Sequence, residues 1–196
     1  MFKELIAKSR SIRRFYQDVP IDHTVLRDLV ECARLSPSGR NIQALKFILA
    51  NQVETNARVF ECLAWAGYLK DWPGPEEGER PSAYIVLLLD KAISQGAGVD
   101  HGIAAQSILL AAVEQGLGGC MVGSIKQEQL RQTLQIPDGL DVLLVLALGK
   151  PKEVVVVEPV GPDGDIRYYR DAQAVHHVPK RALNDLILPL GDVAEV

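Results

Sequence analysis

The segment Ala83–Asp90, which reads Ala-Tyr-Ile-Val-Leu-Leu-Leu-Asp, decides the fold that we predict for this chain. It is a continuous apolar run of strand length, and Val142–Gly149 is a second run of the same kind. Strands that lack polar alternation are usually buried on both faces of a sheet. We therefore expect a central sheet with helices packed on each side of it.

Further periodic segments flank these two strands. Two short apolar runs, Lys46–Ala50 and Gly118–Val122, predict two more strands. Apolar residues at helical spacing predict five helices. One ends at Arg10, one begins after a possible N-cap at Asp22, and three cover Thr55–Ala66, Ala104–Gln115 and Lys126–Gln135.

Two segments lack this periodicity. The stretch Asp71–Ser82 holds three prolines and two glycines among four acidic residues, which predicts a loop that is either a lid or a surface excursion. From about residue 151 the chain mixes a β-branched run, Val154–Val157, a turn cluster, Gly161–Asp165, and the edge-strand candidate Arg167–Arg170. Such a tail is too short to be a domain. We expect one domain over residues 1–196, with the tail packed on the body or on a second subunit.

Composition narrows the class of protein. The chain has 196 residues, 47% of them hydrophobic, and a formal net charge of −4, so a single core is expected and a general nucleic-acid binder is not. No apolar run reaches membrane-spanning length, and the first five residues do not resemble a secretory signal. We expect a soluble, cytoplasmic protein.

Three widely spaced cysteines predict buried thiols rather than disulfides or a zinc site.

Several catalytic motifs are missing from the sequence. It contains no phosphate-binding Gly-x-x-x-x-Gly-Lys-Ser/Thr loop, no Gly-x-Gly-x-x-Gly, no Gly-x-Ser-x-Gly and no His-Glu-x-x-His. Adjacent residues of a strand point to opposite sides, so His176 and His177 do not predict a metal site. We predict neither a metal nor a catalytic side chain.

Three segments are suited to binding a ligand, and each also has an ordinary structural explanation. Ser9–Phe15 carries guanidinium and hydroxyl groups that suit a phosphate, or form a solvated basic face. Ser36–Gln43 places small donors and two carboxamides before a strand, where they suit the polar edge of a heterocycle or form a capped turn. The glycines of Gly116–Ser124 allow close approach of a planar ligand, or tight packing of helix on strand.

Taken in order, the motifs resemble the nitroreductase family of flavin-mononucleotide (FMN) oxidoreductases over nearly the whole chain. The motifs are Arg10–Arg13, Ser36–Gln43, Asp100–Ser107, Gly116–Gly123, Leu146–Pro151 and Pro179-Lys180-Arg181. The resemblance implies an α+β, nitroreductase-like fold with a central mixed sheet flanked by helices. It also implies an intertwined homodimer with FMN at the interface of the two subunits.

The resemblance also implies roles for particular residues. Arg10, Ser11 and Arg13 would hold the ribityl phosphate, and Lys180 or Arg181 would close the phosphate site. The backbone at Val122 and Gly123 would face the reactive part of the flavin ring. The residues that would reach the ring from the other subunit are Pro37, Ser38, Gly39 and Asn41, with Gln43 nearby.

The sequence departs from the family pattern at three places. Many members carry a basic residue where Ser9 stands, so Arg14 is an alternative phosphate contact. Ala44 and Leu45 stand where proline and an aromatic residue are common. The stretch from about Val154 to Val178 is longer than in compact members.

The resemblance implies a reaction as well. Reduced nicotinamide, NADH or NADPH, would reduce FMN, and a nitroaromatic, a quinone or a similar electron-poor acceptor would then take the electrons in the same pocket, with ping-pong kinetics. Two alternatives stay open: another flavin reaction on the same fold, such as reductive dehalogenation or the oxidation of a flavin or another ring, and a flavin-binding module without turnover.

Overall fold

The structure is a computed structural model that describes residues 2–189. It contains two compact units, Met1–Lys152 and Glu153–Val196. That the whole chain forms one domain with an extended tail stays a prediction. Within residues 2–189, no helix is both long and apolar enough to cross a lipid bilayer.

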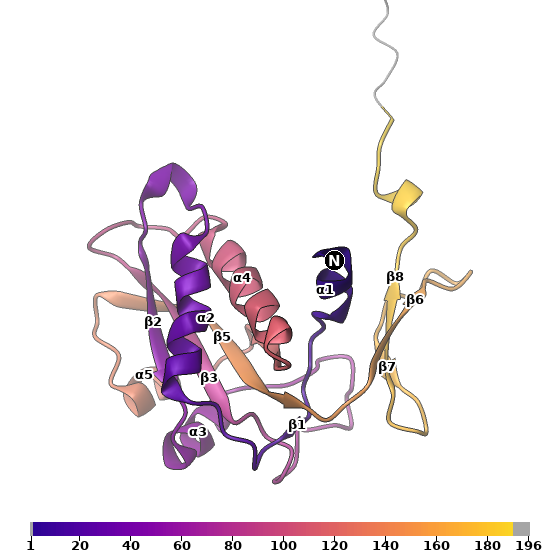
Figure 1. Cartoon of the computed structure of the whole chain (residues 1–196), viewed down its shortest axis with the longest axis horizontal. Coiled ribbons are helices and arrows are strands. Elements are labelled where there is room, and N and C mark those ends of the chain that lie inside the picture. The colour runs from indigo at the N-terminus through magenta and orange to yellow at the C-terminus, as the bar shows by residue number, and fades with distance from the viewer. Residues whose placement is uncertain (1, 190–196) are drawn as a thin grey trace, which may run out of the picture. The chain divides into compact units, whose positions relative to one another are not determined.

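The first unit is built on a five-stranded sheet (Figure 1). Strand β3 (Ala83–Asp90) and strand β5 (Leu140–Pro151) form its centre. Strand β2 (Leu45–Ala50) pairs with the free side of β3, and both β1 (Phe15–Tyr16) and β4 (Gly118–Val122) pair with the other side of β5. The two predicted central strands are therefore confirmed, and β4 and β2 lie at opposite edges.

The sheet differs from the expected mixed sheet in its strand directions. All its ladders among the described residues are antiparallel, and parallel pairing in the first unit is limited to an isolated bridge between Ser11 and Gly119. The reason is the connection from β3 through helix α4 (Asp100–Glu114) to β4. This crossover makes β3 and β4 run in the same direction, but β5 lies between them and pairs antiparallel with both.

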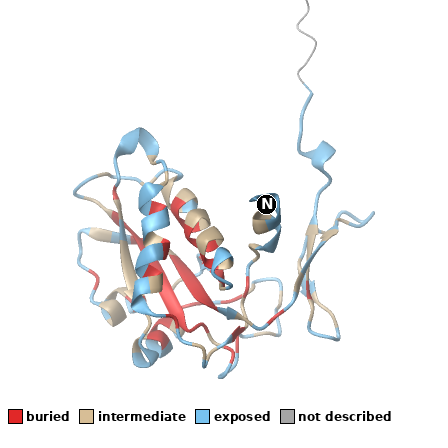
Figure 2. Cartoon of the chain, in the orientation of Figure 1, coloured by how far each residue is buried: buried red, intermediate tan, exposed pale blue. Residues whose placement is uncertain are grey.

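Helices cover both faces of this sheet, as the apolar strands predict. On one face α2 (His23–Leu35) and α4 pack against Ile85 and Leu87 of β3. On the other face α3 (Val53–Phe60) and α5 (Gln127–Leu134) pack near Tyr84 and Val86. Figure 2 shows the buried residues gathered along the strands and along the sides of the helices that face them. A short helix, α1 (Phe2–Lys8), precedes this core and packs near α4.

The predicted helix over Thr55–Ala66 is too long, because α3 ends at Phe60. Beyond this point Leu63 forms a bridge with Ile125, and the backbone N–H of Ala64 donates to the carbonyl of Ser124 at 2.9 Å. The hydrophobic residues after Phe60 are thus buried by extended chain rather than by helix. This pairing places residues 62–64 directly beside the chain that follows β4.

The predicted loop Asp71–Ser82 has no helix or strand, but its later part is anchored rather than a surface excursion. Buried Glu79 accepts hydrogen bonds from Arg14 and lies 2.9 Å from Lys152 Nζ. The Arg14 guanidinium, together with Lys152, lowers the pKa of Glu79 to about 2. Gly74 has a φ of +125°, and a Cβ there would lie 2.6 Å from the Trp65 ring. The loop therefore packs closely on the first unit.

The cysteines are free, as predicted, but only two of them are buried. Cys62 and Cys120 lie in the core, whereas Cys32 is exposed on α2. The prediction of a buried thiol is wrong for Cys32, because this residue lies on the face of the helix that points away from the sheet.

The second unit contains a three-stranded sheet. Strand β8 (His176–Lys180) lies in the middle, parallel to β6 (Val155–Pro159) and antiparallel to β7 (Tyr169–Arg170). A short 3-10 helix, η2 (Leu183–Asp185), follows it. The prediction that residues 167–170 form an edge strand is confirmed at Tyr169 and Arg170.

The imidazole of His177 links the parts of this small sheet. Its Nδ1 lies 2.9 Å from a carboxylate oxygen of Glu158 on β6, and its Nε2 lies 3.1 Å from one of Asp171, which follows β7. The ring of Tyr169 stacks on the imidazole, with 4.7 Å between centroids. Because both nitrogens face carboxylates, the pKa of His177 is raised, mainly by the hydrogen bond to Glu158 and next by the hydrogen bond to Asp171.

We predict that this sheet loosens as the pH rises through the raised pKa of His177. The protonated ring can donate to both carboxylates, so its stabilisation is complete below the ordinary pKa of 6.5 and is lost above the pKa in the folded chain. NMR titration should give His177 a pKa above 6.5, and the double variant Glu158→Gln, Asp171→Asn should lower it. Amide protection in β8, corrected for intrinsic exchange, should fall over the same pH range.

Exposed His23, at the start of α2, provides a reference signal in the same spectra. A His177 pKa that does not change in the double variant would contradict this account.

Candidate functional site

The predicted phosphate segment lies beside the first residues of β4. The backbone N–H of Ile12 donates to the carbonyl of Gly119 at 2.9 Å, and Ser11 forms a bridge with the same glycine. The structure therefore brings together Arg10–Arg13 and β4, which are more than a hundred positions apart in the sequence.

The arginines of this segment differ in their partners. Half-buried Arg10 donates to the carbonyls of Ser9, at 2.7 Å, and Ile6, at 3.2 Å, and has no carboxylate partner among residues 2–189. Arg13 donates to the carbonyl of Ser11 at 3.3 Å. Arg14, the alternative phosphate contact, is instead paired with Glu79. Carbonyl groups thus orient Arg10 without neutralising its charge, as a phosphate site requires.

The two glycines of β4 are packing positions, whereas the glycine that follows the strand is an open position. A Cβ at Gly119 would lie 2.7 Å from the carbonyl oxygen of Ala147, and one at Gly118 would lie 2.9 Å from Ile12. At Gly123, nothing described lies within 4 Å of the Cβ position. Tight packing therefore explains the first two glycines, whereas the exposed backbone at Gly123 can be approached by a flat ligand.

Val122 directs its side chain into the core beneath α3 and α5, and it is 5% exposed. Its neighbour Gly123 is exposed at the edge of the sheet. The exposed surface at this point is consequently main chain.

The second predicted segment forms a tight loop ahead of β2. Ser36 Oγ lies 2.7 Å from Ser107 Oγ, and the backbone N–H of Gly39 donates to Asp100 at 2.8 Å. A short 3-10 helix, η1 (Gly39–Asn41), lies within it. Three non-glycine residues of the loop have left-handed φ angles of 53° to 56°, namely Arg40, Asn41 and Gln43. Such angles persist where the surrounding structure imposes them, and they are common at functional sites.

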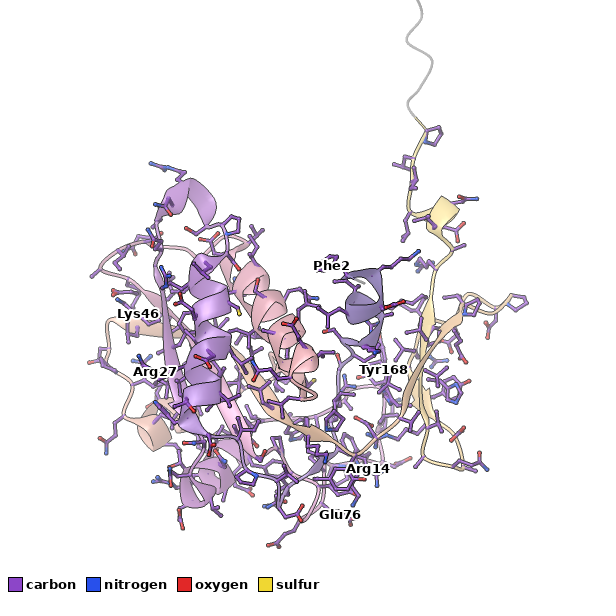
Figure 3. All side chains as sticks on the ribbon, viewed as in Figure 1. Phe2, Arg14, Arg27, Lys46, Glu76 and Tyr168 are labelled. Carbon is purple, nitrogen blue, oxygen red and sulfur yellow. The ribbon has the colours of Figure 1, made fainter. Side chains whose placement is uncertain are left out.

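A cavity of about 470 Å³ opens beside this loop. Pro37, Ser38 and Gln43 line it from the loop, and α2 and β2 form its walls, with Arg27 and Lys46 among the lining residues (Figure 3). The Oγ atom of Ser38 is buried without a hydrogen-bond partner among the described residues. The loop therefore presents an unused polar group where a ligand can be bound.

The two groups of predicted residues are not assembled within one chain. Across the sheet, Val122 pairs with Val145, Val145 with Val86, and Val86 with Ile48 of β2. This is three strand spacings, or about 14 Å. The loop that leads into β2 therefore lies near the edge opposite Gly123.

Lys180 and Arg181 belong to the second unit, where Lys180 ends β8 and both side chains are exposed. That one of them closes the phosphate site stays a prediction.

Sequence reasoning gave no separate role to two residues that position the site. Asp100 fixes the loop through Gly39, and Glu79 holds Arg14. For Asp100 a signal was available: the residue opens the Asp100–Ser107 motif at the start of a long apolar helix. Glu79 lies in an irregular loop and had no signal.

Comparison with known proteins places the chain among its relatives. The model of the nitroreductase family matches residues 6–150. An Archaeoglobus fulgidus protein provisionally named NADH dehydrogenase/NAD(P)H nitroreductase is 30% identical over 76% of this chain and 85% of its own length. A Bacillus subtilis protein named FMN reductase (NADPH) is 29% identical over 89% of this chain and 72% of its own length.

The fold has solved counterparts as well. The structure of an FMN-dependent nitroreductase from Clostridium difficile superposes with a TM-score of 0.63 at 26% identity. The match covers 76% of this chain and 87% of that protein.

The strained loop generates a stability prediction. Gln43→Gly should stabilise the chain relative to Gln43→Ala by about 1 kcal/mol, because glycine adopts the φ of 56° without the steric cost of a Cβ. Both substitutions remove the same side chain, so their difference isolates the backbone. Urea unfolding followed by tryptophan fluorescence measures it, and equal stabilities would show that the loop is not strained at this residue.

Proposed function

The chain belongs to the nitroreductase family, and from this premise we propose that it uses FMN to pass electrons from NADH or NADPH to a small electron-poor acceptor such as a nitroaromatic or a quinone. The observation that carries the proposal is the position of Arg10, which has no carboxylate partner among the described residues, beside the strand that leads to the open backbone of Gly123. Together they suit the phosphate and the ring of one flavin.

The names of relatives support the cofactor and the class of reaction. The Bacillus subtilis relative is named an FMN reductase that uses NADPH, and the Clostridium difficile protein is named an FMN-dependent nitroreductase. A further relative, from Vibrio harveyi and 24% identical, is named an NADPH-flavin oxidoreductase. This chain is accordingly an oxidoreductase, and the identity of the acceptor is the part that we propose.

The residues present fit FMN. Arg10, Ser11 and Arg13 would bind the phosphate, with Lys180 or Arg181 as a further cation. The main chain of Val122 and Gly123 would lie against the ring. Bound FMN supplies the acceptance and donation of hydride. The side chains here bind and orient, so the site needs no nucleophile or general base.

We propose that each site is shared by two chains of a homodimer. The loop residues Pro37, Ser38, Gly39, Asn41 and Gln43 lie near the sheet edge opposite Gly123, so a second chain would supply them to the same ring. In this arrangement Ser38 Oγ, which has no hydrogen-bond partner in the described part of the chain, would gain one, and the left-handed loop would present its backbone to the ligand.

The open glycine generates the first test of the site. Gly123→Val should weaken FMN binding at least tenfold, because its side chain would occupy the space left for the ring. Gly139→Val is the matched control, since a Cβ at this exposed glycine is equally unobstructed and lies outside the site. Fluorescence titration of the apoprotein with FMN measures both affinities. Equal affinities in the two variants would remove Gly123 from the site.

Subunit complementation tests the shared site. Arg10→Ala and Ser38→Val should each lose FMN binding and NADH oxidation as homodimers. After exchange of subunits, a mixed dimer pairs an intact Arg10 with an intact loop at one of its two sites, so about a quarter of the wild-type sites should return. A mixture that stays inactive while size-exclusion and mass measurements show mixed dimers would contradict sharing.

A further inference from the structure

The layer between α3 and β3 gathers buried polar atoms that have no hydrogen-bond partner among residues 2–189. They are Asn56 Oδ1, Trp65 Nε1, Arg80 Nε, Ser82 Oγ and Tyr84 Oη. Four of the five residues are more than nine-tenths buried, and Arg80 is half-buried. Buried polar groups are nearly always paired, so five in one layer call for a ligand or ordered water.

These atoms come from neighbouring side chains. The Arg80 guanidinium lies over the Phe60 ring, 4.3 Å from its centroid, and Phe60 packs on Trp65 at 5.6 Å. Asn56, one helical turn before Phe60, donates to the carbonyl of Ser82 at 2.7 Å. Ser82 and Tyr84 alternate with Ala83 and so share the face of the sheet that lies under α3. Helix, strand and loop thus enclose one polar layer.

Arg80 carries a charge that this layer does not balance. Its side chain contacts the Phe60 ring and has no carboxylate partner in the part of the chain that the structure describes. The neighbouring Arg14 is paired with Glu79, so that carboxylate is already engaged. A half-buried guanidinium without a counter-ion is costly, since its desolvation is not offset by a paired charge.

The balance of donors and acceptors indicates the chemistry of the missing partner. Arg80 and Trp65 can only donate, Ser82 and Tyr84 can each donate, and Asn56 Oδ1 is the one obligate acceptor. An excess of donors around a cation favours an anion over neutral water. We propose that this layer binds a small monovalent inorganic anion, of the size of a halide, through Arg80, Trp65, Ser82 and Tyr84.

Such an anion would hold the irregular chain between α3 and β3 against both elements. The same chain begins at residues 62–64, which pair beside Ile125 and so lie next to the proposed ring position at Gly123. The anion site is independent of the proposed function, because none of its residues contacts the flavin in that proposal.

Crystals of the full chain grown in sodium bromide test the inference. We expect an anomalous peak within hydrogen-bond distance of Arg80 and Trp65 Nε1. In solution, the Tm should be higher in bromide than in gluconate at constant ionic strength, by about 7 °C at one hundred times the Kd. Arg80→Gln should abolish this rise, whereas Arg58→Gln, on the exposed face of α3, should retain it. If Arg80→Gln does not fold, Trp65→Phe removes a single donor and should weaken bromide binding.

Three results would overturn the inference: water molecules in place of the anomalous peak, bromide bound at crystal concentration without any effect on Tm, or a bromide effect that Arg80→Gln and Trp65→Phe leave intact.

Discussion

Burial of β3 and β5 on both faces is the constraint on which the rest of the first unit depends. Their side chains contact α2 and α4 on one side and the α3 and α5 layer on the other. Each helix is therefore held by the sheet, and the position of every loop follows from which strand or helix end it joins. The segments that we propose for the phosphate and for the ring of FMN meet because α4 returns the chain to β4, on the far side of β5 from β3.

This arrangement also explains why the site is open within one chain. The crossover brings β4 beside the segment that holds Arg10, whereas α2 delivers the 36–43 loop to the opposite edge at β2. In our proposal, a second chain supplies this loop and so completes the site. The strained angles at Arg40, Asn41 and Gln43 fit a loop whose shape serves a partner rather than its own stability.

The local sequence pattern was sufficient to predict most of the fold, but it predicted less of the site. Ala83–Asp90 and Gly118–Val122 match their predicted bounds because apolar runs bounded by turn residues leave little choice. Helix α3 is shorter than predicted because extended pairing of Leu63 with Ile125 overrides helical periodicity, and such long-range pairing has no local signal. For the same reason the sequence could not distinguish packing glycines from Gly123, nor assign Glu79 to Arg14.

The most direct test of the central claim is the absorbance spectrum of the purified chain before and after anaerobic addition of NADH or NADPH, with the released cofactor identified by mass. We predict FMN absorbance that bleaches on addition of the reduced nicotinamide and returns when a quinone is added. A colourless chain that takes up no FMN would contradict the site, and bound FMN that neither nicotinamide bleaches would contradict the proposed reaction.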